Sequence, residues 1–178
     1  MQQFDLETQI LAAAAQLERQ GRYADTRRFV QHGGVTVYRH CVRVAVLSCR
    51  LADAFGWQVD RAALIRGALL HDYFLYDWHE KDDSHRLHGF THPRTALRNA
   101  CADWTLTDRE QNIILRHMFP LTPVPPACRE GWLVCLADKL CAVQEMVTTR
   151  TARLRPRRAA AEGPACGRAW SRASRFSR

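Results

Sequence analysis

Apolar residues recur at intervals of three and four along most of the chain, and this periodicity restricts the fold more than any other feature. In the segment VTVYRHCVRVAVLSCRLADAFGW, Val37, His40, Val44, Leu47 and Leu51 follow this helical spacing. No segment alternates between apolar and polar residues as a half-buried strand does, and the chain has no visible repeat and no glycine-rich phosphate loop. The chain is therefore predicted to be all-α.

Local signals indicate where the first helices begin and end. Strong helix formers fill residues 7–20, and Gly21 is expected to end that helix. A long amphipathic helix is expected to end near Gly56, and Asp60 suits the N-cap of a third helix. These signals predict three core helices before residue 76.

The second half of the chain begins with a polar, aromatic stretch over residues 76–91, which is expected to form a loop. Pro93 suits the first position of the next helix, and Thr107 with Glu110 forms a capping-box pattern before another. A last core helix is expected over residues 129–147. The expected fold is a single compact helical bundle.

A length of 178 residues with 47% hydrophobic residues fits one domain with a substantial core. Residues 1–34 are expected to be an N-terminal helical extension packed on the core, and residues 35–147 the core domain itself. The net charge of +8 lies in residues 148–178, which hold nine arginines and one acid. This basic tail lacks a periodic apolar face and is expected to be disordered, and a shifted reading frame would also produce such a composition.

The compartment is expected to be the cytoplasm. No run approaches the ~18 apolar residues that cross a bilayer, and the amino terminus MQQFDLETQI lacks the layout of a signal peptide. The seven cysteines are odd in number and form no CxxC motif, so reduced thiols are expected in place of a disulfide framework.

Charged and imidazole side chains on the apolar faces of predicted helices are the main functional signal. They are His40, His71, Asp72, His117 and Asp138. Burying such groups without partners is costly, and no lysine or arginine on the same faces offers an obvious counter-charge. A single histidine on an apolar face is more often a hydrogen-bonded core residue than a ligand. Several of them on separate helices favour a divalent cation that binds them together.

The order of these residues resembles the HD superfamily of metal-dependent phosphohydrolases, an all-helical family with the signature H…HD…D. The motif residues stand in VYRHCVRVA, GALLHDYF and LVCLADKL, and His92 and His117 match the longer form H…HD…H…H…D of the binuclear branch. The resemblance implies that His40, His71, Asp72 and Asp138 hold one metal, and that Asp72 bridges to a second metal held by His92 and His117. It covers approximately residues 35–147.

The resemblance also implies a reaction, the hydrolysis of a nucleotide or another small phosphate ester by a water or hydroxide between two metals. The ligand types are compatible with iron, manganese, cobalt, nickel or zinc and do not distinguish between them. Many members of the superfamily carry Glu or Lys three residues after the HD aspartate, where this chain has Leu75. This departure puts any particular substrate assignment in doubt.

Residues of the polar loop and of the last core helix are candidates for the remaining roles. Asp77 and His88, together with His79, could protonate the leaving group, although a solvated polar loop explains each of them equally well. Lys81 and Lys139, with Arg86, could contact phosphate, although most of these cations are expected to be ordinary surface charges. Tyr73, Phe74, Tyr76 and Trp78 are assigned to the core rather than to a base-stacking site.

Other functions stay open at this point. Some proteins with the same H…HD…H…H…D ligand set are di-iron oxygenases, and a non-catalytic metal- or ligand-binding domain is a further alternative. The expected partner is a small phosphorylated substrate, and nucleic-acid binding is not expected except through the basic tail. The sequence indicates no oligomeric state.

Overall fold

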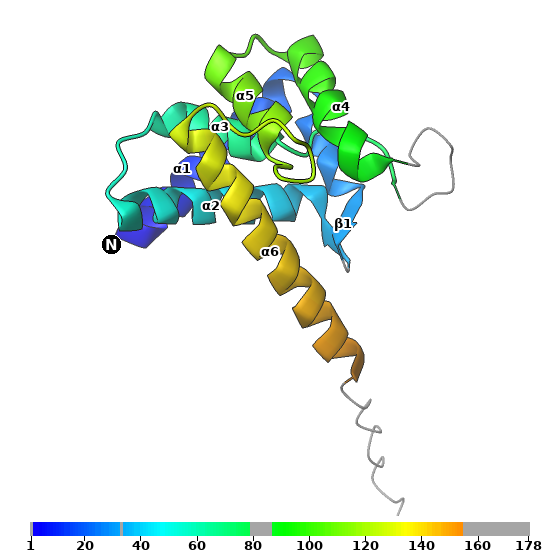
Figure 1. The fold of residues 1–178 in the computed structure, drawn as a ribbon. Helices are drawn as coiled ribbons and strands as arrows, with labels where there is room; N and C mark the ends of the chain where they lie inside the picture. Colours follow the sequence, from blue (N-terminus) through cyan, green and yellow to red (C-terminus); the bar gives the residue numbers. More distant parts are fainter. Residues whose placement is uncertain (1, 33, 79–86, 155–178) are drawn as a thin grey trace, which may run out of the picture.

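The structure is a computed structural model, which describes residues 2–32, 34–78 and 87–154. In these described ranges six α-helices surround the main apolar core, as the periodicity predicts, and Figure 1 shows their arrangement. The helices are α1 (Gln2–Gln20), α2 (Val37–Phe55), α3 (Arg61–Leu70), α4 (His88–Asp103), α5 (Asp108–Arg116) and α6 (Arg129–Leu154), with a 3-10 turn η1 (Tyr23–Arg27) after α1.

The helix ends confirm the local signals. The Asp60 side chain accepts a hydrogen bond from the backbone at the start of α3, and Thr107 with Glu110 closes a complete capping box on α5. Gly56 ends α2 in the left-handed conformation, with φ 63°. These ends were predictable because a cap depends on residues that are near neighbours in the chain.

A short antiparallel hairpin is the exception to the all-helical prediction within the described ranges. It consists of β1 (Val30–His32) and β2 (Val35–Thr36), with Val30 opposite Thr36. Strands of two and three residues are too short to show an alternating pattern in the sequence, and the prediction of an all-α fold is confirmed despite them. The hairpin carries the chain into α2.

The prediction that Pro93 begins a helix was wrong. Helix α4 begins at His88, inside the stretch expected to be a loop, and Pro93 is its sixth residue. A proline inside a helix removes the bond to the carbonyl four residues earlier, which here belongs to Gly89. The loss is confined to the second turn, so the helix continues to Asp103.

Helix α6 is longer than expected. It was predicted to end at residue 147 but continues to Leu154, so the first residues of the predicted disordered tail are helical. Residues 155–178 lie outside the described ranges. Figure 1 shows the second half of α6 extending away from the other helices.

The core is continuous from the N-terminal helix to α6. Ile10, Ala14 and Leu17 on α1 belong to the same buried cluster as Val44 on α2 and Val134 on α6. The N-terminal helical segment therefore completes the core beneath α2 and α3.

Helices α3 and α5 approach closely where Gly67 faces Ile113. A Cβ on Gly67 would lie 2.6 Å from Ile113 Cδ1, closer than packed atoms tolerate. The missing side chain lets the two helices meet, and each helix is followed at once by a histidine, His71 after α3 and His117 after α5. Their rings lie 4.8 Å apart between centroids.

The six cysteines in the described part of the chain are all unpaired, and four of them are buried. Among the helices described, none combines the length and the hydropathy that a bilayer-spanning segment needs.

Candidate metal centre

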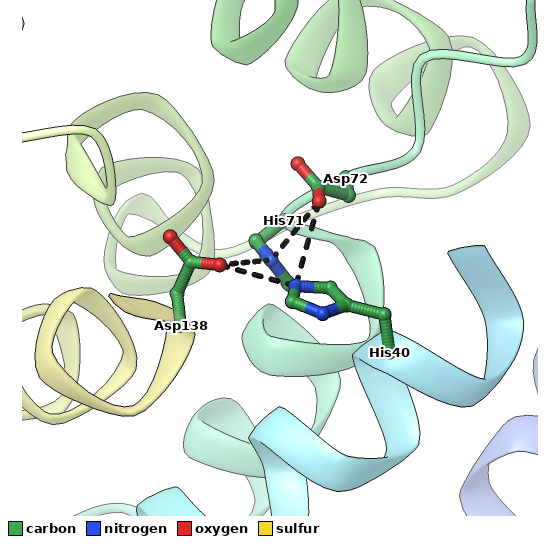
Figure 2. A group of neighbouring side chains, drawn as sticks. All are labelled: His40, His71, Asp72 and Asp138. Atoms are coloured by element: carbon green, nitrogen blue, oxygen red, sulfur yellow. Dashed lines mark hydrogen bonds and ion pairs between the residues drawn. The ribbon is translucent and has the colours of Figure 1, made fainter. Parts of the chain in front are cut away.

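Three helices bring four of the expected ligands together. His40 lies on the first turns of α2, His71 and Asp72 follow the last residue of α3, and Asp138 lies in the first half of α6. Figure 2 shows the four side chains converging, and their ligand atoms all lie within 4.8 Å of one another. His40 Nε2 is 3.1 Å from Asp138 Oδ1, and all four residues are buried.

A second group shares Asp72 with the first. His92 on α4 and His117 at the end of α5 place their Nε2 atoms 3.2 Å and 3.6 Å from Asp72 Oδ1. The other carboxylate oxygen, Oδ2, faces the first group at 3.4 Å from His71 Nε2. Because its two oxygens face different groups, Asp72 has the geometry of a bridging ligand.

The tautomers of these histidines are set by their own helices. His71, His92 and His117 each place Nδ1 2.7–2.8 Å from a main-chain carbonyl three or four residues earlier in the chain. A carbonyl only accepts, so each Nδ1 donates and the neutral ring carries its lone pair on Nε2. All three lone pairs therefore face the centre of the cluster, and fixing the outer nitrogen in this way is usual for histidines that bind metals.

Two of these lone pairs face each other directly. His92 Nε2 and His117 Nε2 are 2.9 Å apart, although both Nδ1 atoms already carry the ring proton. In addition, His71 Nε2 and Asp72 Oδ1 are buried without a hydrogen-bond partner among the described residues. Repelling lone pairs and unbonded buried acceptors at one point are what a bound cation would relieve. The residues present therefore fit divalent metal ions.

A comparison with known protein families matches the HD domain over residues 37–143. The chain belongs to the HD domain family. All six expected metal ligands lie within the matched residues of this HD domain. Neither the curated proteins nor the solved structures gave a match.

Glu145 is a member of the site that the sequence reasoning did not select. This α6 residue is fully buried, and its Oε2 accepts a hydrogen bond from His40 Nδ1 at 3.0 Å. Its other oxygen pairs with Arg43 at 3.1 Å. The signal was available, because Glu145 stands seven residues after Asp138 and so lies on nearly the same face of α6. His40 thus resembles the other three histidines in having its outer nitrogen occupied.

Gln31 is the second residue that was missed. It is buried, and its side-chain amide donates to Asp72 Oδ2 from strand β1. Nothing in the sequence pattern identified it, because the short hairpin that carries it was not expected. The hairpin therefore contributes directly to the HD site by holding the bridging carboxylate.

Buried charges in the HD site shift the pKa values of its histidines in opposite directions. Burial opposes protonation of His40, but hydrogen bonds to Asp138 and Glu145 outweigh it and raise the pKa of His40 to about 10. Burial, together with repulsion by His71 and His92, lowers the pKa of His117 to about 3. Burial would also raise the pKa of Asp138, yet the hydrogen bond from His40 and the electrostatic effect of nearby His71 hold it well below its usual range. Without metal, protons therefore balance part of the carboxylate charge.

The turn after the HD pair is held in an unusual conformation. Leu75 adopts a left-handed backbone, with φ 57°, which is strained for a residue with a branched side chain. The Asn99 side chain supports the turn by donating to the carbonyls of Tyr73 and Phe74, each at 3.0 Å. Leu75 packs against the core, so this position supplies packing and carries no charged group.

A cavity of about 840 Å³ opens from the second ligand group. Four expected ligands, Asp72, His92, His117 and Asp138, lie on its wall, and Trp78, Leu87, Phe90, Met118, Pro120 and Leu121 supply most of the apolar lining. His40 and His71 are fully buried and do not line it. The second ligand group is therefore the part of the centre that a substrate could reach.

The structure places the other candidate residues differently. His88 lines the cavity, its ring stacked between those of Trp78 and His92, and its Nδ1 lies 2.9 Å from the Tyr76 hydroxyl. Asp77 is half-buried and is not part of the cavity lining. Tyr73 and Phe74 are buried in the core as expected. The candidates His79, Lys81 and Arg86 lie outside the described residues.

Lys139 lines the cavity, but its ammonium group is already engaged. Nζ donates to the His117 carbonyl at 3.0 Å, and to the carbonyl and the sulfur of Cys135 at 3.2 Å and 3.3 Å. These contacts account for its three protons. In this arrangement Lys139 holds the end of α5, and with it the backbone of His117, in place.

Proposed function

We propose that this HD domain is a metal-dependent phosphohydrolase that cleaves a small phosphate ester, such as a nucleotide, with a metal-activated water. The observation that carries the proposal is the 2.9 Å contact between His92 Nε2 and His117 Nε2, both directed at the bridging Asp72 on the wall of a large cavity. Such an arrangement offers a cation its ligands and leaves room for a substrate beside it.

His40, His71, Asp72 and Asp138 would hold one divalent cation, and Asp72, His92 and His117 a second. When bound, the two cations supply acidification of a water molecule and neutralisation of charge on the phosphoryl oxygens. The described wall of the cavity carries one cationic side chain, Lys139, whose protons are already used. Recognition of the phosphate by the described residues would thus depend on the metal centre.

The protein itself contributes a prearranged ligand set. The outer nitrogen of each of the four histidines is already hydrogen-bonded, so the rings need not turn when a metal ion binds. Asp72 is held by Gln31 on its Oδ2 side, which fixes the direction of Oδ1 toward His92. The apolar walls at Trp78 and Phe90 fit the organic part of a phosphate ester.

We assign protonation of the leaving oxygen to His88. It is a titratable side chain on the cavity wall, next to His92 and supported by the Tyr76 hydroxyl. Asp77, the other candidate among the described residues, does not line the cavity. Replacement of His88 by Gln should therefore lower kcat for esters with poor leaving groups more than for nitrophenyl phosphate, which needs little protonation.

The test is metal analysis of anaerobically purified protein, followed by a screen of phosphate esters with and without oxygen. Two metals per chain and oxygen-independent phosphate release are expected, and Asp138→Asn should abolish release. Asp53→Asn is the matched control, because Asp53 is an exposed carboxylate paired with Arg61 on the surface. Oxygen consumption by an iron-loaded protein without phosphate release would instead indicate an oxygenase, and metal binding without turnover a binding domain.

A further inference from the structure

Helix α6 is apolar on two opposite sides. Val134, Ala137 and Cys141 pack into the core, as expected for a helix of a globular domain. On the other side lie five large apolar residues that are 41–56% exposed, and we call them the outer face: Trp132, Leu136, Leu140, Val143 and Val147. A helix that is apolar around its circumference is normally buried on all sides. The outer face of α6 is therefore an apolar surface on which no other described element packs.

The spacing of the outer face is that of a helix-pairing seam. Its residues follow one another at steps of four, four, three and four, which keeps them within ~80° of one another around the helix axis. Leu136, Leu140, Val143 and Val147 alternate steps of four and three, the pattern of paired helices. A partner helix is thus the shape that fits this face.

An apolar hollow continues the outer face at the N-terminal end of α6. It has a volume of about 360 Å³ and is lined by Phe55, Trp57, Phe119, Trp132 and Leu136, among others. Phe55 and Trp57 are themselves 50% and 37% exposed. At the other end of the face, Val143, Met146 and Val147 are exposed on the part of the helix that extends from the body (Figure 1). One end of the surface is therefore hollow and the other protrudes.

This combination is self-complementary. We propose that the outer face of α6 is the interface of a homodimer, in which a second copy of the chain packs its own α6 antiparallel against it. An antiparallel pair places the protruding end of each helix over the hollow of the other, as a two-fold interface requires. In the register set by the alternating spacing, Leu136 meets the partner's Val147 and Leu140 meets the partner's Val143.

The chain outside the described residues is a poorer occupant. Residues 155–178 contain only two large apolar side chains, Trp170 and Phe176, against the five of the outer face. Their nearest neighbours are arginine, serine and alanine. A second α6, by contrast, supplies a seam of the same length and spacing.

The available area also suits a dimer. The five outer-face residues, with Phe55, Trp57 and Met146, make eight large apolar side chains that are 37–56% exposed. At ~80–100 Å² exposed for each, they offer ~700 Å² per copy, within the ~600–1,000 Å² per partner of a standard stable interface. A single monomer seldom leaves an apolar patch of this size uncovered.

The experiment is light scattering coupled to size exclusion on the full chain, with Leu140→Glu as the disrupting variant. Leu11→Glu on α1 is the matched control, because Leu11 and Leu140 are both 48% exposed. The unaltered chain and Leu11→Glu should have twice the monomer mass at micromolar concentration, and Leu140→Glu should have half of that mass with an unchanged circular dichroism spectrum. A monomeric unaltered chain would overturn the proposal, as would a Leu140→Glu dimer.

The orientation is tested by disulfide trapping in a background where the exposed Cys101 is replaced by Ser. An oxidised mixture of Leu136→Cys and Val147→Cys chains should give the mixed dimer, whereas an interface formed by parallel helices would link each variant mainly to itself. A chain that stays monomeric and binds vesicles of anionic lipid through Leu140 would show that the outer face covers a membrane surface instead. Either of these last two results would contradict the antiparallel dimer.

Discussion

Replacement of Glu145 by Gln tests whether the first ligand group binds metal as its geometry suggests. The substitution keeps the size of the side chain but removes the negative charge that accepts the proton of His40 Nδ1 at 3.0 Å. Loss of a hydrogen-bond partner behind a metal-binding histidine typically weakens metal binding ~10–100-fold, which is ~1.4–2.7 kcal/mol. Because the amide oxygen of Gln can still accept, we expect ~10-fold for Glu145→Gln and ~100-fold for Glu145→Ala.

Arg43 does not change this expectation much. It would lose its ion pair with Glu145, but its guanidinium is 40% exposed and also donates to Gln144. A guanidinium with access to water is only slightly destabilised by losing one partner. The loss of affinity should therefore report the His40 contact.

The assay is competition for Zn²⁺ or Co²⁺ with a chromophoric chelator, with the two binding steps resolved. Only the step assigned to His40, His71, Asp72 and Asp138 should weaken, because Glu145 has no contact with His92 or His117 among those described. Glu18→Gln is the control, since Glu18 pairs with Arg27 away from the site. Unchanged affinity in Glu145→Ala, or equal weakening of both steps, would refute the reasoning.

Three further outcomes are expected. Asp72→Ala should lose both metals, whereas His92→Ala should empty only the second position, as measured by metal content per chain; equal depletion in the two variants would argue against a bridging Asp72. Gly67→Ala should destabilise the protein by ~1–3 kcal/mol in chemical denaturation, because the new methyl group would collide with Ile113. This cost should exceed the gain from the better helix propensity of alanine. A neutral or stabilising effect would contradict this packing. In the chelated protein, the pKa of His40 is raised to about 10, and the stability that this shift contributes is complete below the unfolded pKa near 6.5. That stability is lost as the pH rises toward 10, so Tm should fall between these two values. A Tm that rises over this range would contradict the charge assignment.

Local signals predicted most of the helices. Asp60 and the Thr107 and Glu110 pair marked helix starts correctly because each cap is formed within four residues. Pro93 misled the prediction because proline is tolerated in the second turn of α4 as well as at its first position. The end of α6 was missed because no glycine or proline follows Val147 directly, and a helix can continue through the polar and basic residues there.

The expected ligands were visible from the sequence because burying them on helices is costly without a common partner. The resemblance to the HD family supplied the grouping around Asp72, and the structure gives the same two groups. Gln31 gave no signal, because it lies on a hairpin that the sequence did not predict. Glu145 shares a face of α6 with Asp138, but its contact with His40 joins helices that are distant in the sequence, and local spacing does not show such a contact. The engagement of Lys139 by backbone carbonyls was equally hidden.

The length of α6 has a further consequence for how the domain could respond to its surroundings. One continuous helix carries Asp138 and Glu145 on its inner side and Leu140 and Val143 on its outer side. A displacement of this helix would therefore move both pairs of residues together. If a partner binds the outer side more tightly when the metals are bound, thermodynamic reciprocity requires that the partner strengthens metal binding by the same factor. Metal binding and self-association would then be coupled through α6, so a change in either equilibrium would shift the other.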